Sequence, residues 1–376
     1  MLPEFCPNPR CTYHNATQVN YSGHWVSRGT YDTLVVGPVH RFTCSACGRG
    51  FSERTFSIQY YTKLKLDLKE IYRATSAAES ISSIARHLHC SGDSIQNRVD
   101  RLARAGLFAH AQLRGYQSLR EDLVADGFES FDRSQYYPNN INLLVGKDSQ
   151  FLYTQTHATL RRKGRMSARQ KLMREKLESS YKPPKGALIH AFTRLLEYIF
   201  CIWKPEQYPK LALWTDEHYA YPLAIAKLVN LVESRKTGSF EHIRHPAKAA
   251  RTLHNPLFAV NYYDRELRKD IAAFRRESTC FTRNPSNGMA RFILHMVWHN
   301  YQKPHRVRVS RLKKVHAEAA GIPETAIQDE LTKVFEWRPF LSKCQLTLDE
   351  NMIWLKKTIT PGSKKLNYMP KYALVC

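Results

Sequence analysis

Three aspartates are candidate ligands of a catalytic metal ion. Asp216 directly follows the apolar run 211–214, which predicts a short buried strand. Asp126 follows a second apolar run, and Asp264 lies on a predicted helix that starts near Asn261. A charge at the end of a buried strand is tolerated where it binds a metal ion. The alternative is that Asp216 only begins the next helix, where a carboxylate favours the positive end of the helix dipole.

Neighbouring acids compete with Asp126 and with Asp264 for these assignments. The competitors are Asp122, Glu129, Asp132, Glu266, Asp270 and Glu277. Glu129 is the runner-up to Asp126, because Asp122 lies at the start of the strand and Asp132 beyond its end. Asp264 is preferred because Asn261, Arg265 and Arg268 fall about one helical turn away and can share its face. Its alternative role is a solvated ion pair on a basic helix.

Four of the nine cysteines fall within the first 50 residues: Cys6, Cys11, Cys44 and Cys47. The Cys-x4-Cys and Cys-x2-Cys spacings, each beside turn-forming residues, predict two knuckles that clamp one tetrahedral zinc ion. The segment between them is rich in β-forming residues, so we expect residues 1–57 to form a zinc ribbon. Such a closed site is structural and carries no chemistry. Three histidines, His14, His24 and His40, lie close enough to compete as ligands, and His14 is the best substitute for Cys11.

Residues 60–108 have a helix-turn-helix pattern. Apolar positions at 81–88 and 95–102 predict two short helices that share one apolar face, with Ser91 as the N-cap of the second. Its other face, expected to be exposed, would present side chains able to read base edges: Ser94, Gln96, Asn97, Arg98 and Arg101. The alternative is an ordinary helical hairpin.

The charge of the chain indicates a polyanionic partner. With 376 residues and a formal charge of +24, it favours nucleic acid first and an anionic membrane surface second. A basic run, followed by a Pro-Pro break, is an expected phosphate-contacting surface or a solvated helix face, and it contains Arg161, Arg162, Lys163 and Arg165. Arg268 is a further candidate DNA contact. No apolar run approaches the ~20 residues of a spanning helix, and the N-terminus lacks a secretion signal, so we expect the protein to remain in the cytoplasm.

The expected fold is a multidomain α/β protein. Three consecutive strands near 123–153 and a fourth at 211–214 predict a mixed sheet flanked by helices within residues 118–305, interrupted by a basic helical insertion at about 157–205. Residues 306–376 are expected to form a basic helical segment and tail that touches DNA or a second protomer.

In this order of parts the chain resembles the bacterial insertion-sequence DDE/D transposases that carry a zinc ribbon and a helix-turn-helix ahead of a ribonuclease H-like domain. The resemblance rests on CPNPRC with CSACG, SISSIARHLHCSGDSIQNRV, ADGFESF, LWTDEHYAYP and VNYYD, and covers most of residues 1–305. One departure is that Asp264 stands where many relatives carry Glu, so Glu266 or Glu277 could supply that acid instead.

The resemblance implies an activity and its requirements. Asp126, Asp216 and Asp264 would hold two Mg²⁺ or Mn²⁺ ions, which generate the nucleophile and neutralise the departing 3′ oxygen. Water would cut at the element end, and the freed 3′ hydroxyl would then attack target DNA without a covalent protein intermediate. Two DNA ends would require a homo-oligomer, acting at the bacterial nucleoid. The alternatives are a DNA-binding regulator that has lost its chemistry and a nuclease of the same fold.

Overall fold

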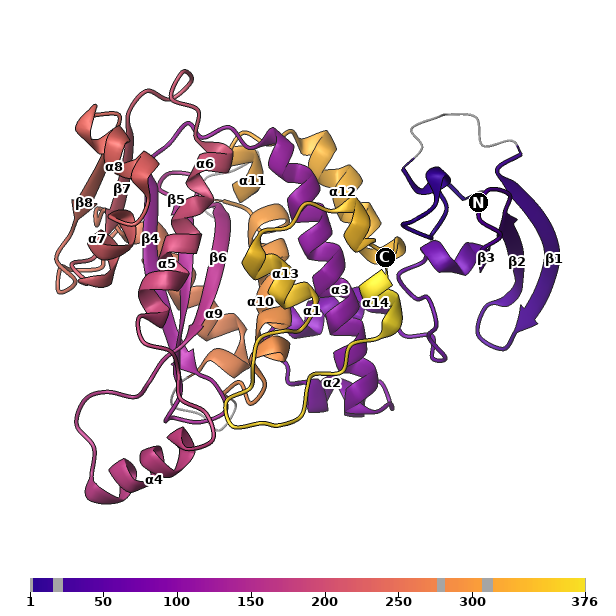
Figure 1. Cartoon of the computed structure of the whole chain (residues 1–376), viewed down its shortest axis with the longest axis horizontal. Coiled ribbons are helices and arrows are strands. Elements are labelled where there is room, and N and C mark those ends of the chain that lie inside the picture. The colour runs from indigo at the N-terminus through magenta and orange to yellow at the C-terminus, as the bar shows by residue number, and fades with distance from the viewer. Residues whose placement is uncertain (1–2, 16–22, 276–280, 306–313, 376) are drawn as a thin grey trace.

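The computed structural model describes residues 3–15, 23–275, 281–305 and 314–375. The N-terminal part forms a three-stranded antiparallel sheet of β1 (Trp25–Thr33), β2 (Gly37–Cys44) and β3 (Gly50–Ser52). Its small core consists of three cysteines with Trp25 and Phe51 packed against them. This module stands apart from the main body at the right of Figure 1.

Three helices follow, each begun by a side-chain cap. They are α1 (Leu68–Ser76), α2 (Ile81–His87) and α3 (Gly92–Leu113). The side chain of Ser80 accepts a hydrogen bond from the backbone of Ser83, and that of Ser91 accepts from Ser94, which satisfies donors that a helix start leaves open. The helix α3 is far longer than the short second helix predicted at 95–102, because its apolar positions continue to Leu113.

The main sheet has five strands in the order β6-β5-β4-β7-β8. These strands are β4 (Leu123–Phe131), β5 (Pro138–Gly146), β6 (Leu152–Thr159), β7 (Leu211–Thr215) and β8 (Phe240–Arg244). The first three are antiparallel neighbours, whereas β7 pairs parallel with β4, and β8 parallel with β7. The fold is therefore mixed α/β, as expected.

Helices cover this sheet and its carboxyl edge. They are α5 (Ala187–Glu197), α6 (Ile199–Ile202), α7 (Ala220–Ile225), α8 (Val229–Lys236) and α9 (Phe258–Asp270). The chain breaks between α7 and α8. Contacts join α5 to β5 and β6, and α9 to β4 and β5.

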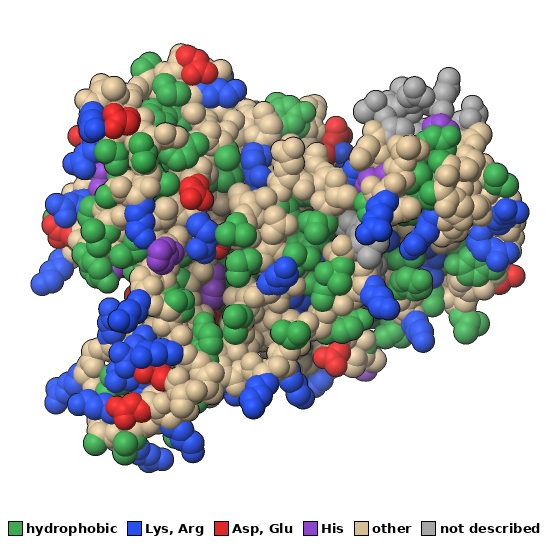
Figure 2. Space-filling view, in the orientation of Figure 1, with side chains coloured by type: hydrophobic (Ala, Val, Ile, Leu, Met, Phe, Trp, Pro, Cys, Tyr) green, Lys and Arg blue, Asp and Glu red, His purple; other side chains and the backbone are tan. Residues whose placement is uncertain are grey.

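Between β6 and α5 the chain leaves the body as a basic arm, residues 160–186. The arm carries α4 (Ala168–Glu178), none of whose residues is buried. The insertion is shorter than the expected 157–205, because residues 157–159 complete β6 and α5 belongs to the core. Figure 1 shows the arm projecting from one end of the sheet, and Figure 2 shows Lys and Arg side chains gathered on it.

The C-terminal part packs into the body. It follows α10 (Pro285–Tyr301) and contains α11 (His316–Ala319), α12 (Glu324–Glu336), α13 (Leu348–Trp354) and α14 (Lys371–Val375). Both α10 and α12 pack along α3. One continuous hydrophobic core thus runs from Ile58 through the main sheet to Trp354, so the helical module and the sheet form one body.

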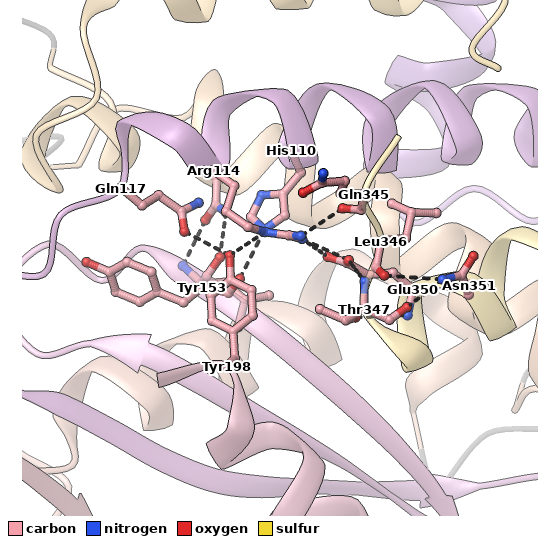
Figure 3. Close-up of polar contacts among 12 residues, drawn as sticks. His110, Arg114, Gln117, Tyr153, Tyr198, Gln345, Leu346, Thr347, Glu350 and Asn351 are labelled. Carbon is pink, nitrogen blue, oxygen red and sulfur yellow. Dashed lines mark hydrogen bonds and ion pairs between the residues drawn. The ribbon is translucent and has the colours of Figure 1, made fainter. Parts of the chain in front are cut away.

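A polar network locks α13 onto α3 (Figure 3). One nitrogen of Arg114 donates to both carboxylate oxygens of Glu350, at 2.8 Å each, and another donates to the hydroxyl of Tyr198 at 3.0 Å. Next to it, His110 contacts the carbonyl of Tyr153 on β6 at 3.0 Å. The network joins α3, the sheet, α5 and α13 through groups that are largely shielded from water.

The N-terminal module, which holds β1, β2 and β3, contacts the chain that follows α12. Backbone hydrogen bonds join Ile58 to Glu336 at 3.0 Å and Arg338 to Phe56 at 2.7 Å, and Phe5 packs edge-on against Phe340. In the part of the chain described here, no helix combines the length and apolar character needed to cross a membrane.

Candidate metal centre and active site

The four predicted zinc ligands come together. The sulfur of Cys6 lies 3.6 Å from that of Cys47, and the sulfur of Cys11 lies 3.7 Å from that of Cys44, with all four within 4.8 Å of one another. A tetrahedral zinc ion with Zn–S bonds of about 2.3 Å requires sulfurs separated by about 3.8 Å. The cluster therefore has the donors and the spacing of a structural zinc site.

The three competing histidines do not join this cluster. His14 is buried and uses both ring nitrogens elsewhere, one 2.6 Å from the carbonyl oxygen of Cys6 and the other 2.8 Å from the hydroxyl of Ser342. His24 stacks on Tyr13 with ring centroids 3.9 Å apart, and His40 is exposed. His14 instead ties the cysteine loop to the C-terminal part of the chain.

The register of the main sheet brings Asp126 level with Asp216. Leu123 pairs with Leu213 and Val124 with Trp214 across the parallel strands β4 and β7, so the same offset of 90 residues places Asp126 opposite Asp216. Asp216 is the first residue after β7, and its Oδ1 accepts a hydrogen bond from the backbone of His218 at 2.8 Å.

Asp264 approaches the same edge from α9. Its Oδ1 is buried and has no hydrogen-bond partner among the described residues. Burial, followed by the charge of Asp126, raises the pKa of Asp264 well above its usual range, whereas Arg268 and Arg251 oppose the rise. A buried carboxylate oxygen without a partner is expensive, and a bound cation or proton would remove that cost.

Asp126 interacts electrostatically with both Asp216 and Asp264. Burial, and then the charge of Asp216, raise the pKa of Asp126 to about 6, against the lowering effect of hydrogen bonds from Gly127 and Tyr221. Three carboxyl groups thus interact through a poorly solvated space, and like charges make ionisation of each harder.

Tyr221 stands at the centre of this group. Its hydroxyl donates to Asp126 Oδ1 at 3.0 Å. Burial, and then the charges of Asp126, Asp216 and Asp264, raise the pKa of Tyr221 well above its usual range. Tyr221 was not among the site residues predicted from the sequence. Its position at the start of α7, five residues after Asp216, was the available signal, whereas no local signal indicated the influence of exposed Arg251.

The three aspartates nevertheless do not form a ready coordination group. Within the described ranges, the four cysteines are the one set of three or more His, Cys, Asp and Glu residues whose ligand atoms approach within 4.8 Å. The hydrogen bond from His218 to Asp216 closes a turn ahead of α7, whose N-cap is Tyr219, so Asp216 does not cap that helix. The three carboxylates therefore interact electrostatically, but their oxygens do not all lie within 4.8 Å of one another.

Most rival acids near β4 are engaged in holding the fold. Asp122 accepts from Ala212 of β7 at 3.1 Å and from Trp214 at 3.2 Å, which fixes β4 beside β7. Asp132 is fully buried and accepts from Asn139 at 2.8 Å. Glu129 is exposed on β4.

The described rivals on α9 contact other side chains. Glu266 is buried and contacts both Lys303 and His299, and hydrogen bonds and charges from these partners hold its pKa well below the usual range despite the opposing effect of burial. Asp270 lies 3.7 Å from His295. Glu277 falls outside the described residues. Of these acids, Asp264 is the one whose pKa responds to Asp126.

Two of the expected base-reading side chains are interior. Arg98 and Arg101 are each 5% exposed. Arg98 donates to the carbonyl of Leu64 at 2.8 Å and Arg101 to that of Ile58 at 2.7 Å. The expectation that they lie on an exposed DNA-reading face is therefore wrong, because their guanidinium groups donate hydrogen bonds to backbone carbonyls of the segment before α1.

The other candidates on α3 remain near its start. Ser94, Gln96 and Asn97 are half-buried. Gln96 donates to Asp100 at 2.8 Å, and the amide oxygen of Asn97 accepts from Arg101 at 2.9 Å. This end of the helix still presents polar side chains to solvent, while part of their hydrogen bonding is used within the helix.

The basic residues of the arm differ in their partners. Arg161 forms a bidentate pair with Glu178 at 2.5 and 2.9 Å, and Arg162 donates to Gln135 at 2.6 Å. Lys163 and Arg165 are exposed.

Two arginines of α9 lie over different aromatic rings. Arg268 lies over the ring of Phe128 on β4, 4.6 Å from its centroid, beside the carboxylate edge. Exposed Arg265 lies over Tyr262 on its own helix, with its guanidinium carbon 4.9 Å from the ring centroid.

Comparison with known proteins does not assign the chain to a family. No family model matches it, and no curated protein matches it at a significant level.

Proposed function

We propose that the protein is a DNA transposase that cleaves DNA at element ends and transfers the freed 3′ hydroxyl strand into target DNA. The observation that carries this proposal is the interaction of Asp126, Asp216 and Asp264 around Tyr221. Three carboxylates gathered at one sheet edge form an expensive arrangement for a protein with no use for a cation.

The strand order supports a ribonuclease H-like assignment for the main sheet. Three antiparallel strands followed by two parallel ones are the arrangement that the resemblance implies, with one aspartate on the first strand and another after the fourth. A third acid reaches the edge from a later helix. This order of acidic groups matches the proposed catalytic set.

The donor chemistry of the three aspartates fits Mg²⁺ or Mn²⁺, which prefer carboxylate oxygens. When bound, two such ions would activate the attacking hydroxyl and neutralise the leaving oxygen. The chain's own residues prepare that step: Tyr221 holds Asp126 through its hydroxyl, and the backbone of His218 orients Asp216. The unpartnered oxygen of Asp264 offers a further ligand.

The basic surfaces supply a path for DNA. Ten Lys and Arg residues against two Glu fall within residues 160–186, on an arm that begins where β6 ends. The start of α3 with α2 is the proposed sequence-reading end, through Ser94, Gln96 and Asn97. Because two DNA ends must be joined in one reaction, at least two protomers would assemble on DNA.

The test is incubation of the protein with DNA carrying its own element ends and Mg²⁺ or Mn²⁺, for the wild type, Asp216→Ala and Glu217→Ala. Glu217 is the matched control, since it is the adjacent carboxylate and is exposed. Binding, new 3′ ends and joined products are scored separately. We expect wild type and Glu217→Ala to cut and join, and Asp216→Ala to bind equally and do neither.

Binding without cleavage by all three proteins under any divalent metal would reject the transposase proposal. Cleavage without joining would instead indicate a nuclease of the same fold.

A DNA-binding regulator is the second candidate. It is favoured by the absence of a carboxylate set within 4.8 Å in the described part of the chain and by the turn that Asp216 caps. Under this alternative the zinc module and the α2–α3 end would bind DNA, and substitution of Asp216 would leave every measured property except local stability unchanged.

A further inference from the structure

A groove on the zinc module combines aromatic rings with arginines. It has a volume of about 610 Å³ and runs between the strand face and the loop that leads to α1. Its lining includes Arg28, Tyr31, Arg41, Tyr60 and Tyr61. No described Asp or Glu lines it, so its fixed charge is positive. This groove is separate from both the cysteine cluster and the carboxylate edge.

The loop at its rim holds a tyrosine in a costly conformation. Tyr61 has φ +58°, a left-handed backbone that a bulky L-residue adopts at an energetic cost. Its side chain is 75% exposed, so no burial repays that cost. Arg54 fixes the loop by donating to the carbonyls of Gln59 at 3.2 Å and Thr62 at 3.4 Å, on either side of the two tyrosines.

The two rings are also supported from behind. The centroids of Tyr60 and Tyr61 lie 4.2 Å apart, and the guanidinium of Arg338 covers Tyr60 at 4.6 Å from its centroid. Arg338 in turn donates to the carbonyl of Thr55. Tyr61 therefore packs against a tyrosine that Arg338 holds in place, and the ring of Tyr61 is the one exposed to solvent.

The arginines lie across the groove on the strands. Arg41 donates to the backbone carbonyl of Arg28 at 3.3 Å and lies over the ring of Tyr31 at 5.6 Å, while Arg28 donates to Thr43 at 3.2 Å. Both arginines are exposed. Their guanidinium groups suit phosphate oxygens, and exposed aromatic faces suit the flat surface of a nucleobase.

We propose that this groove binds an unpaired segment of DNA, with bases stacked on Tyr61 and Tyr31 and phosphates held by Arg28 and Arg41. Bases in a duplex are already stacked on one another and hidden from such rings, whereas an unpaired strand exposes both base faces and backbone. The choice of DNA rests on the proposed function. The chemistry alone selects a single-stranded nucleic acid.

The experiment measures binding of the zinc-loaded full-length protein to fluorescent dT12, rU12 and a 12-base-pair duplex. The decisive variant is Tyr61→Gly, because glycine adopts positive φ without penalty and should preserve or increase stability while removing the ring. Tyr61→Phe keeps the ring. Tyr116→Ala is the control, since Tyr116 is a second exposed tyrosine, outside the groove.

We expect Tyr61→Gly to weaken dT12 binding at least fivefold and to leave duplex binding unchanged, while Tyr61→Phe and Tyr116→Ala bind like the wild type. Arg28→Gln should lower the dependence of log K on log salt concentration for dT12 by about 0.7. Equal dT12 affinity of wild type and Tyr61→Gly, or equal loss on duplex, would refute the groove as a site for unpaired bases. Tighter binding of rU12 than of dT12 would overturn the choice of DNA.

This result is independent of cleavage. Failure of the wild type to cut DNA while Tyr61→Gly selectively loses dT12 binding would reject the transposase proposal and leave the groove standing. If the wild type cuts and joins DNA while Tyr61→Gly binds dT12 like the wild type, the groove proposal is rejected and the transposase proposal stands.

Discussion

Replacing Asp126 by Asn should stabilise the protein at neutral pH. Asn keeps the oxygen that accepts hydrogen bonds from Gly127 and Tyr221, so the change removes the charge with little loss of contacts. The folded pKa of about 6 against an ordinary 3.8 corresponds to a penalty of about 3 kcal/mol at pH 7.5, at about 1.36 kcal/mol per pKa unit.

The sign follows from linkage. An acid whose pKa is raised by folding destabilises the fold above its folded pKa, and the penalty fades as pH falls through the folded value toward the unfolded one. The gain from Asp126→Asn should therefore fall to about half by pH 5 and to a small remainder near pH 4. Urea unfolding of both proteins between pH 4 and 8 measures this difference.

Divalent cations provide the second half of the test. Mg²⁺ that binds the folded state stabilises it by RT ln(1 + [Mg²⁺]/Kd), about 2.7 kcal/mol at 100 times Kd. We expect this gain for the wild type, and much less for Asp126→Asn. Glu129→Gln, an exposed acid three residues along the same strand, should change neither profile.

Two results would contradict this reasoning. Loss of stability in Asp126→Asn at every pH would mean that burial and the charge of Asp216 do not destabilise the ionised Asp126 in the folded state. Equal stabilisation of both proteins by Mg²⁺ would mean that the cation binds away from Asp126.

Three further outcomes are expected. Cys44→Ser, or removal of zinc by a chelator, should unfold the N-terminal module while the main core persists, since the two have separate hydrophobic clusters; limited proteolysis should release the first ~57 residues. Glu350→Ala should cost about 3–5 kcal/mol in urea unfolding, because it leaves the partly buried Arg114 without its carboxylate partner. Combined Lys163→Gln and Arg165→Gln substitutions should lower the salt dependence of duplex binding by about 1.8 in log K per log salt, whereas equal slopes would place DNA elsewhere.

Local patterns predicted the elements that carry the candidate site. The apolar run before Asp216 is β7, and the helix that bears Asp264 begins three residues before the expected Asn261. The paired cysteines converge as their spacing predicts, because a short chain with two knuckles has few ways to bring four sulfurs together.

Partners distant in sequence were beyond local reasoning. Arg98 looks like a base reader on a helical projection, yet a carbonyl 34 residues upstream receives its guanidinium group. Glu266 and Asp264 are two positions apart on α9, and they differ because Glu266 contacts His299 on α10 and Lys303 just after it. Periodicity identifies a helix and its apolar face, but which other segment completes a polar side chain is decided by tertiary packing.

The length of α3 has a consequence for geometry on DNA. At 22 residues and about 1.5 Å per residue, the helix is about 33 Å long, close to one turn of B-form duplex. One end begins at the proposed sequence-reading turn, and the other is fixed to the sheet and α13 through His110 and Arg114. Under the proposed function, α3 would hold the sequence-reading turn at a fixed distance from the main sheet, so the sequence that is read and the bond that is cut should keep a constant spacing in base pairs.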